Sequence, residues 1–359
     1  MAELVKDMKC ASCGGVLEFD PTVQQLRCSS CKEITVFDKT GSVEENELSH
    51  YTDREKLSEV WEHTVTVNCK NCGGQFVINA DEVSGRCIYC GSTRTANLKD
   101  FPSLVPDGVV PFKIDRTKAS DILKKWAKKR FWAPRDFKKK LQELSLKGIY
   151  LPFYTYDSDT FSTYTAQAGD YYYVTVPHTV YQNGKAKTVM RQERRTRWRH
   201  VSGHFEKFYD DVWITAFPEE KNGVIVREDY SKDAVKPYSP EYLSGYSAQM
   251  YSKPVLDGFS DAKSEIKERI RGEIIKKINA DEVAALNVDT SFENNTFKFV
   301  FAAMWLYSYQ YKGKVFSAAV SGLTGRVKGK SPVSVCKVLI AILLAVLLLV
   351  GVWFLITNS

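Results

Sequence analysis

Residues 10–15 read Cys-Ala-Ser-Cys-Gly-Gly, and residues 28–31 read Cys-Ser-Ser-Cys. The same pattern returns as Cys-Lys-Asn-Cys-Gly-Gly at residues 69–74 and as Cys-Ile-Tyr-Cys at residues 87–90. Both copies have the spacing C-x2-C-G-G-x12-C-x2-C, and the second copy begins 59 positions after the first. Self-similarity at a fixed offset indicates two small units with the same fold.

The paired cysteines predict two structural zinc ions. A Cys-x-x-Cys turn brings two thiolates to one metal ion, and two such turns complete the tetrahedral shell that Zn²⁺ prefers. Four thiolates leave no open position for a substrate, so we expect structural and not catalytic sites. Each ribbon is too small to be stable through apolar burial alone, and metal binding should supply its folding free energy, about 10–16 kcal/mol. An iron–sulfur cluster or a redox-active dithiol is the alternative. The expected ligands are Cys10, Cys13, Cys28, Cys31, Cys69, Cys72, Cys87 and Cys90.

A disulfide interpretation of these cysteines is disfavoured. Disulfide frameworks are typical of small secreted domains that follow a signal peptide. Residues 1–20 contain charged residues and no apolar run long enough for export. We therefore expect a reducing compartment.

The remainder of the chain predicts an α+β domain. Residues 115–147 have the apolar spacing of two helices, with lysines on the opposite face of the first. Residues 149–217 are dense in Tyr, Val, Thr and Trp, which favours strands, and Gln-Asn-Gly-Lys at 182–185 predicts a hairpin turn. A helix is expected near residues 260–279, with Ile266, Ile270 and Ile274 on one face, and two or three strands between residues 296 and 327. Strands with interspersed helices, without βα alternation, are typical of the α+β class.

The C-terminal end predicts one transmembrane helix. Residues 338–356 are 19 consecutive uncharged residues, enough to cross a hydrocarbon layer of about 30 Å. Lys and Arg precede this run and none follows it, so we expect a tail anchor with the bulk of the chain in the cytoplasm. The expected boundaries are zinc ribbon 1 at 1–39, an acidic linker at 40–63, zinc ribbon 2 at 64–100, an antiparallel-sheet-rich α+β domain at 101–330, and the tail anchor at 333–357.

Charge is distributed unevenly along the chain. Residues 1–100 have 11 Lys/Arg against 16 Asp/Glu, whereas residues 101–200 have 20 against 9. An acidic ribbon region is a poor ligand for phosphates, because nucleic-acid binding depends on Lys and Arg. Protein partners are therefore favoured for the ribbons. The basic stretches at 113–147 and 185–199 are consistent with contact to anionic lipid, with nucleic acid or with plain solvation.

No enzymatic constellation is recognisable. Residues 325–331, Gly-Arg-Val-Lys-Gly-Lys-Ser, are one residue short of a phosphate-binding loop. His200 and His204 lie in a strand pattern without the Glu of a zinc protease motif. Two acidic pairs are interpreted as turn residues and not as an acid–base couple: Asp157/Asp159 and Asp210/Asp211.

The order of these segments resembles a known family. The twin ribbons and the terminal span are accompanied by Gly148–Asp157, Gly169–Tyr173, Arg197-Trp198 and Val201–Gly203. Together they resemble the bacterial TFIIB-type zinc-ribbon membrane proteins, the YdjG-like proteins of phage-shock-type loci. The resemblance covers nearly the whole chain. It implies a membrane partner or recruiter for envelope-stress proteins, such as coat-like and SPFH-domain assemblies.

The sequence therefore predicts a non-enzymatic, membrane-anchored scaffold that binds cytoplasmic protein partners at the inner membrane. The alternative is a membrane-tethered nucleic-acid-binding protein that uses the basic stretches at 113–147 and 185–199. Binding to a protein should persist at moderate salt, whereas binding to phosphates should collapse.

Overall fold

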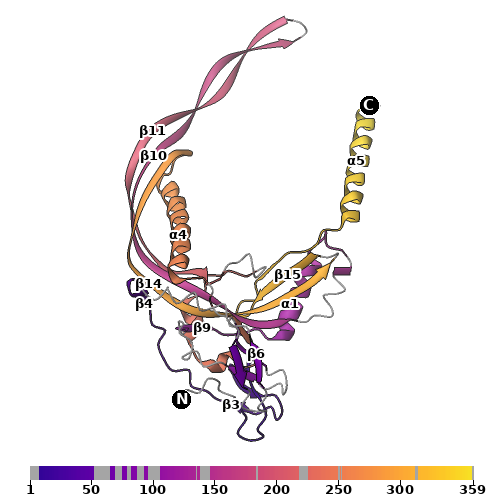
Figure 1. Ribbon diagram of the computed structural model, residues 1–359. Coiled ribbons are helices and arrows are strands. Elements are labelled where there is room, and N and C mark those ends of the chain that lie inside the picture. The colour runs from indigo at the N-terminus through magenta and orange to yellow at the C-terminus, as the bar shows by residue number, and fades with distance from the viewer. Residues whose placement is uncertain are drawn as a thin grey trace.

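The computed structural model describes residues 8–51, 106–134, 136–137, 146–182, 185–217, 225–249, 251, 253–311 and 314–357, together with four strands between residues 65 and 95. Its architecture is α+β, with a large, mostly antiparallel sheet at the centre (Figure 1). The α-helices with described bounds are α1 (Arg116–Lys128), α4 (Val255–Ile278) and α5 (Val335–Thr357).

Three unusually long strands build the sheet: β10 (Lys147–Gln182), β11 (Lys185–Thr215) and β14 (Glu282–Tyr311). Strand β10 lies between the other two and pairs antiparallel with both. At about 3.3 Å per residue, the 36 residues of β10 follow a path of roughly 120 Å. Their density in Tyr, Thr, Val and Phe suits a half-buried pleated surface.

Shorter strands extend this sheet. Strand β9 (Gly108–Val110) pairs parallel with β14, and β12 (Lys236–Pro237) pairs with β9. On the other side, β13 (Ser247–Gln249) pairs parallel with β10. Strands β15 (Lys314–Ser321) and β16 (Val327–Gly329) follow β14 as a meander.

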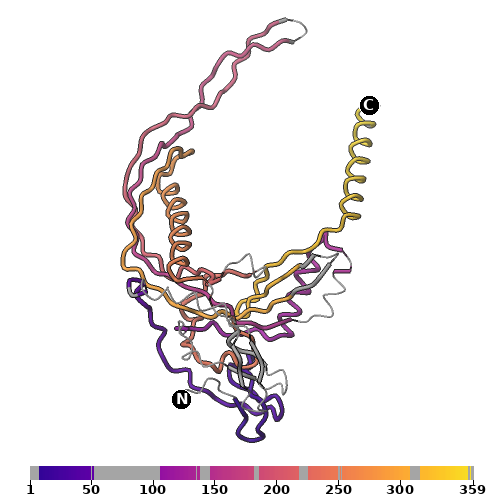
Figure 2. The backbone as a smooth tube through the Cα atoms, viewed as in Figure 1, coloured from indigo at the N-terminus to yellow at the C-terminus, as the bar shows by residue number. Residues whose placement is uncertain are grey.

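Beyond the body, β10 and β11 continue as a two-stranded arm, defined as residues 170–182 and 185–199. The pairing of β14 with β10 ends at Gly169, opposite Glu282, so residues 170–182 pair only with residues 185–197. Trp198 and Arg199, at the root of the arm, face Gly169 and Ala168 of the body. Gln182 lies opposite Lys185, a register that a two-residue connection closes. The predicted Asn-Gly turn itself lies outside the described residues. Figures 1 and 2 show the arm as a twisted ribbon that rises far from the body.

Helix α4 covers one face of the long sheet. Ile266, Ile270 and Ile274 are spaced one helical turn apart and are fully buried, as the sequence predicted. The start of the helix is held at Tyr156, whose hydroxyl donates to the carbonyl of Val255 at 2.7 Å. Gly258 makes this approach possible, because a Cβ there would lie 2.3 Å from the Tyr156 hydroxyl oxygen.

Two predicted boundaries differ from those observed. Strand β14 begins at Glu282 and not near residue 296, because Asn294 and Asn295 form a bulge and not a turn. There Asp157 pairs with Thr296 and Asp159 with Glu293, and Asn294 has a φ of 48°, in the left-handed region that Asn tolerates. The second helix expected within 115–147 is described only at residues 136–137.

The segment expected to be an acidic linker contributes to the body. Strand β4 (Asn46–Glu47) pairs with β14 at Thr296 and Phe297, and a short 3₁₀ helix (Leu48–Tyr51) follows it. The Tyr51 ring contacts the Phe297 ring edge to face at 4.8 Å. Residues 46–51 are therefore held on the sheet.

Helix α5 stands apart from the body. It is long and apolar enough to cross a membrane, with a mean hydropathy of 3.0 over Val335–Phe354, none of it buried. It rises on the same side of the molecule as the arm (Figure 1). The predicted span of 338–356 falls within this helix.

Candidate metal centre

The four cysteines of the first ribbon converge on one point. Cys10 Sγ lies 3.6 Å from Cys31 Sγ, and Cys13 Sγ lies 3.5 Å from Cys28 Sγ. All four sulfur atoms lie within 4.8 Å of one another. A tetrahedral ion with Zn–S bonds of about 2.3 Å separates its sulfurs by about 3.8 Å, whereas a disulfide bond is about 2.0 Å long. The four residues are free thiols that can hold one metal ion.

The two Cys-x-x-Cys turns have the same backbone geometry. The amide of Gly14 donates to the carbonyl of Cys10 at 2.8 Å, and the amide of Lys32 donates to the carbonyl of Cys28 at 3.1 Å. The residue after each second cysteine has a positive φ, 69° for Gly14 and 65° for Lys32. Glycine adopts this conformation freely, whereas Lys32 adopts it at a cost of roughly 1–2 kcal/mol. Each turn thus aims two thiols at the same side of the chain.

Gly15 supplies the space between these turns. A Cβ at this position would lie 2.8 Å from Ser30 Oγ and 2.9 Å from Cys28 Sγ. Such contacts are shorter than van der Waals separation, so a larger residue would push the second turn away from the first. The second glycine of the Cys-Gly-Gly pattern is thereby explained by close packing, and the first by its dihedral angle.

The thiols titrate unequally before a metal binds. Hydrogen bonds from the backbone amides of Cys31 and Ser30 lower the pKa of the buried Cys28 thiol to about 6, against the effect of burial. For Cys31, the Glu33 amide lowers the pKa, but hydrogen bonds with Cys13, burial and the other thiols raise it to about 12. A bound divalent cation would deprotonate the whole set, because thiolates are the metal-binding form.

The second set of cysteines, Cys69, Cys72, Cys87 and Cys90, lies outside the described residues. The strands around it repeat the first ribbon with the same offset of 59 positions. The Lys9–Val16 bridge of the first copy corresponds to the Asn68–Gln75 pair of β5 (Val65–Asn68) and β6 (Gln75–Ile78).

The other hairpin of each ribbon also repeats in register. Arg27 pairs with Ile34 between β2 (Gln25–Cys28) and β3 (Ile34–Thr35). At equivalent positions, Arg86 pairs with Thr93 between β7 (Glu82–Arg86) and β8 (Thr93–Thr95). The second zinc ion remains a prediction that this repeated register supports.

The first ribbon is attached firmly to the body. Its strand β1 (Leu17–Asp20) is hydrogen-bonded to Ser244, whose carbonyl accepts from the Phe19 amide at 2.9 Å and whose hydroxyl donates to the Leu17 carbonyl at 2.8 Å. The Phe19 ring packs on the Tyr242 ring at 5.2 Å. The Gln24 amide group donates to the carbonyl of Phe112 at 2.6 Å. The ribbon therefore shares its hydrophobic core with the α+β domain.

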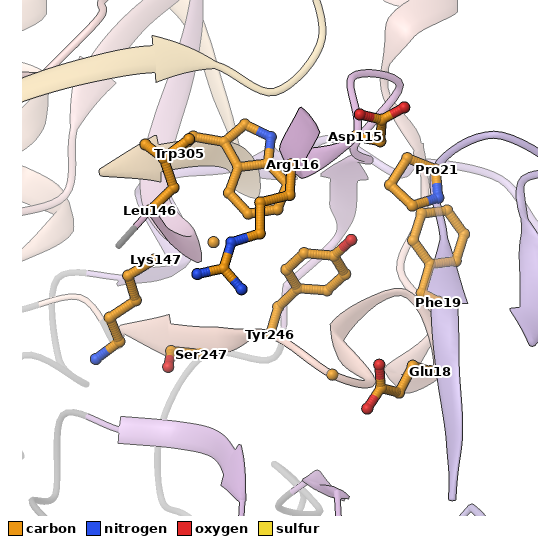
Figure 3. A pocket seen from close by; sticks show the side chains of 12 residues that line it. Glu18, Phe19, Pro21, Asp115, Arg116, Leu146, Lys147, Tyr246, Ser247 and Trp305 are labelled. Atoms are coloured by element: carbon orange, nitrogen blue, oxygen red, sulfur yellow. The ribbon is translucent and has the colours of Figure 1, made fainter. Parts of the chain in front are cut away.

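A cavity of about 700 Å³ lies where the ribbon meets the start of α1 (Figure 3). Glu18 and Phe19 form the ribbon side, and Arg116, Tyr246 and Trp305 form the other side. The lining has both signs of charge, which gives no preference for one class of ligand. The cavity therefore marks the seam between the ribbon and the body.

An ionic cluster in the three-stranded part of the sheet, where β10 pairs with both β11 and β14, could not be read from the sequence. Lys298 Nζ lies 2.7 Å from Asp211 Oδ1, 3.1 Å from Glu45 Oε1 and 3.5 Å from Asp157 Oδ2. The Asp211 amide also donates to Asp157 at 2.6 Å. Burial raises the pKa of Asp157 to about 6, although the Asp211 amide and Lys298 both lower it. For Lys298, burial lowers the pKa, but the hydrogen bond to Asp211 and the charge of Asp157 raise it above the usual value.

The same position groups Asp157, Asp210 and Asp211 within reach of a single ion. The ammonium group of Lys298 already supplies the positive charge among these carboxylates, and Lys232 pairs with Asp210 at 3.1 Å. The interpretation of these acidic residues as turns is therefore wrong: Asp157, Asp210 and Asp211 belong to a bulge between β10 and β11, in which Asp157 is buried and Asp210 exposed, and Asp159 pairs with Phe208 beyond it.

The remaining motifs are parts of the sheet in the described structure. His200 and His204 face Gln167 and Thr163 across the β10–β11 ladder. Gly325 has a φ of 77° in the turn before β16, and β16 occupies the middle of the motif that approximates a phosphate-binding loop. Among the described residues, three or more metal-ligating side chains gather only at the Cys10–Cys31 site and at the Asp157 bulge.

Comparison with known proteins gives one distant relative and no family assignment. The chain is 26% identical over 243 residues to a Bacillus subtilis (strain 168) protein whose printed name is "Uncharacterized protein YdjG". The alignment covers 66% of this chain, and the chain spans 66% of the length of that relative. No family model matches, and no solved structure matches. The chain is therefore a distant homologue of YdjG.

Proposed function

We propose that this protein is a non-enzymatic scaffold, anchored in the cytoplasmic membrane by α5, with its bulk in the cytoplasm and with two structural zinc ions in TFIIB-type ribbons. It binds protein partners at the inner membrane. By resemblance, these partners belong to envelope-stress assemblies of the coat-like or SPFH-domain kind.

The observation that carries this proposal is the arm. Side chains of the types enriched in protein interfaces lie exposed along it, among them Tyr173, Tyr181 and Met190, with 65%, 80% and 65% of their surfaces exposed. Residues of the arm add little to the core of the body, so stability alone does not account for its length. A ribbon of this kind is suited to reach a partner at a distance from the anchor.

Arginines on the arm are ordered against its aromatic rings. The Arg194 guanidinium lies 4.2 Å from the centre of the Tyr171 ring, and the Arg197 guanidinium 5.5 Å from that of Tyr172. Such contacts restrict the side chains before binding, which lowers the entropic cost of forming an interface. A stiffened row of Tyr and Arg is a common composition of binding hot spots.

The nucleic-acid alternative uses the same surface. Residues 170–199 contain seven Lys/Arg and two Asp/Glu, a net charge of +5. Phosphate binding by such a ribbon would depend steeply on salt, because it proceeds by counterion release. Salt and nuclease therefore separate the two hypotheses.

A short-arm variant tests the proposal. Removing residues 173–182 and 185–194 lets Asn183-Gly184 join Tyr172 directly to Arg195, two residues that already face each other in the ladder. The full-length chain and the variant are purified from membranes in detergent, and co-purifying chains are identified before and after nuclease treatment. Phe161→Ser is the matched control, because Phe161 is 43% exposed on β10 but lies outside the arm.

If the protein is a scaffold, specific partner chains should co-purify with the wild type and with Phe161→Ser. This co-purification should resist nuclease and moderate salt, and it should be lost from the short-arm variant. Partners that remain on the short-arm variant would show that the arm is not the binding element. Co-purification that is abolished by nuclease or by moderate salt would favour the nucleic-acid alternative.

A further inference from the structure

Where α5 leaves the body, its first turn is bonded to the segment that follows α1. The Ser334 amide donates to the carbonyl of Trp132 at 2.8 Å. The Lys337 ammonium donates to the carbonyls of Phe131 and Ala133, each at 2.8 Å, and lies 5.6 Å from the centre of the Phe131 ring. Residues about 200 positions apart in the sequence are thus held side by side at the base of the apolar helix.

The side chains at this junction point outward. Phe131 and Trp132 are 70% and 44% exposed, and their rings meet edge to face at 5.2 Å. On α5 and just before it, Val335 and Val333 are 67% and 59% exposed. Exposed apolar side chains therefore lie on both sides of the junction between α5 and the body.

Basic residues border this apolar surface. Lys125, Lys128, Lys129 and Arg130 are exposed, and no acidic residue occurs between positions 122 and 132. Aromatic residues at the headgroup level, with Lys and Arg beside them, are the usual arrangement where a transmembrane helix enters a bilayer. Anionic headgroups attract basic residues near the surface over about a Debye length.

We infer that residues 125–132, together with Lys337, form a lipid-facing platform that seats the body on an anionic phospholipid surface. Phe131 and Trp132 enter the headgroup layer beside α5, and the basic side chains contact lipid phosphates. This inference rests on the proposed function in one respect, namely that α5 spans a membrane.

The platform is the part of the body that is bonded to the base of α5. The arm projects on the same side of the body as α5 (Figure 1). An open two-stranded ribbon with arginines cannot enter hydrocarbon, because its edge amides and carbonyls would have no hydrogen-bond partners. The arm must therefore lie outside the hydrocarbon layer that α5 crosses.

Tryptophan quenching by brominated lipid tests this inference on the full-length chain. The protein is reconstituted into vesicles of phosphatidylglycerol and phosphatidylcholine brominated on its acyl chains close to the headgroup. Trp353 lies in α5, so a loss of quenching on Trp353→Phe reports insertion of α5 itself. The quenching that remains in Trp353→Phe is then compared with that of Trp353→Phe/Trp132→Phe. Trp353→Phe/Trp198→Phe is the matched control, because Trp198 on the arm is also 44% exposed.

The platform predicts that the remaining quenching is lost with Trp132→Phe and retained with Trp198→Phe. Quenching that is unaffected by Trp132→Phe, while Trp353 is quenched, would overturn the platform and leave the membrane anchor intact. Absence of quenching at Trp353 would overturn the anchor and the platform with it.

Charge reversal tests the lipid class. In the Trp353→Phe background, Lys125→Glu/Lys129→Glu should reduce the Trp132-dependent quenching in phosphatidylglycerol vesicles. Equal quenching with and without these substitutions would contradict the assignment of anionic headgroups. Zinc content equal to that of the wild type shows that each variant is folded around its ribbons.

Discussion

Replacing Lys298 with methionine removes the cation that faces three carboxylates in the three-stranded part of the sheet. Its side chain is 8% exposed, and those of Asp157 and Asp211 are 2% and 11% exposed. Methionine retains the apolar length of the lysine stem, so the change is mainly one of charge. The outcome measures how strongly this cluster stabilises the body of the sheet.

The expected cost follows from the burial of the carboxylates. Removing one partner of a buried ion pair typically costs about 3–5 kcal/mol, because the remaining charge is left without compensation. Glu45 is 42% exposed and adds little, since its charge is screened by water. For a body of this size, about 3–5 kcal/mol corresponds to a fall in melting temperature of roughly 10 °C.

The pH dependence has a defined sign. The pKa of Asp157 is about 6 in the folded state and 3.8 without the fold, so protonation favours folding. Its contribution to stability is fully present below the unfolded pKa and is lost as the pH rises through about 6, a difference of about 3 kcal/mol. Without Lys298, the Asp157 carboxylate is less favourable still, so Lys298→Met should be more damaging at pH 7 than at pH 5.

Thermal unfolding of the detergent-solubilised chain, followed by tryptophan fluorescence at both pH values, measures these effects. Asp157→Asn on the Lys298→Met background should recover part of the loss at pH 7, because it removes one of the two carboxylates left without a cation and keeps the oxygen that accepts from the Asp211 amide. A loss below about 1 kcal/mol at pH 7, or an equal loss at both pH values, would refute this reasoning.

Three further outcomes follow from the geometry. Gly15→Ala should abolish metal binding by the first ribbon, as measured by elemental analysis, whereas Gly272→Ala should not, because its Cβ would meet nothing within 4 Å. Removing residues 335–359 should release the chain from membranes, and a truncated chain that still resists carbonate extraction would contradict this. Gly203→Ala should lower the melting temperature by an amount equivalent to about 1–3 kcal/mol, because its Cβ would lie 2.8 Å from the Tyr164 hydroxyl oxygen; an unchanged value would show that the ring can move aside.

Local patterns predicted several elements correctly. The Ile266, Ile270 and Ile274 stripe indicated α4, because burial on one helix face needs no information from distant residues. The apolar run at 338–356 indicated α5, because length and composition are read from consecutive residues. Cysteine spacing brought Cys10–Cys31 together, because each ligand pair lies within a single turn.

The length of the strands was not predictable in the same way. Pro152 and Gly169 within β10, and Gly203 within β11, are residues that usually end a strand. Here Gly203 makes room for the Tyr164 ring on the neighbouring strand, and Gly169 makes room for Trp198. The reason for each glycine lies in its cross-strand partner, which the sequence does not reveal without the register.

The Lys298 cluster was missed for a related reason. Asp157 and Lys298 are separated by 141 positions and meet because β10 pairs with β14 in the register that places Thr155 opposite Lys298 and Asp157 opposite Thr296. Acidic residues next to small polar ones lie more often in turns than in buried ionic clusters. Only the pairing of β10, β11 and β14 distinguishes a turn from such a cluster. Long-range register is the information that was lacking.

Metal analysis of the purified full-length chain shows whether the cysteine repeats hold structural zinc. We expect two zinc ions per chain, and one in Cys28→Ser, because the two sets of ligands belong to separate ribbons. Cys336→Ser is the control, since Cys336 lies at the base of α5 and belongs to neither set, and it should retain both ions. Fewer than two zinc ions in the wild type, iron in their place, or an unchanged count in Cys28→Ser would contradict this expectation.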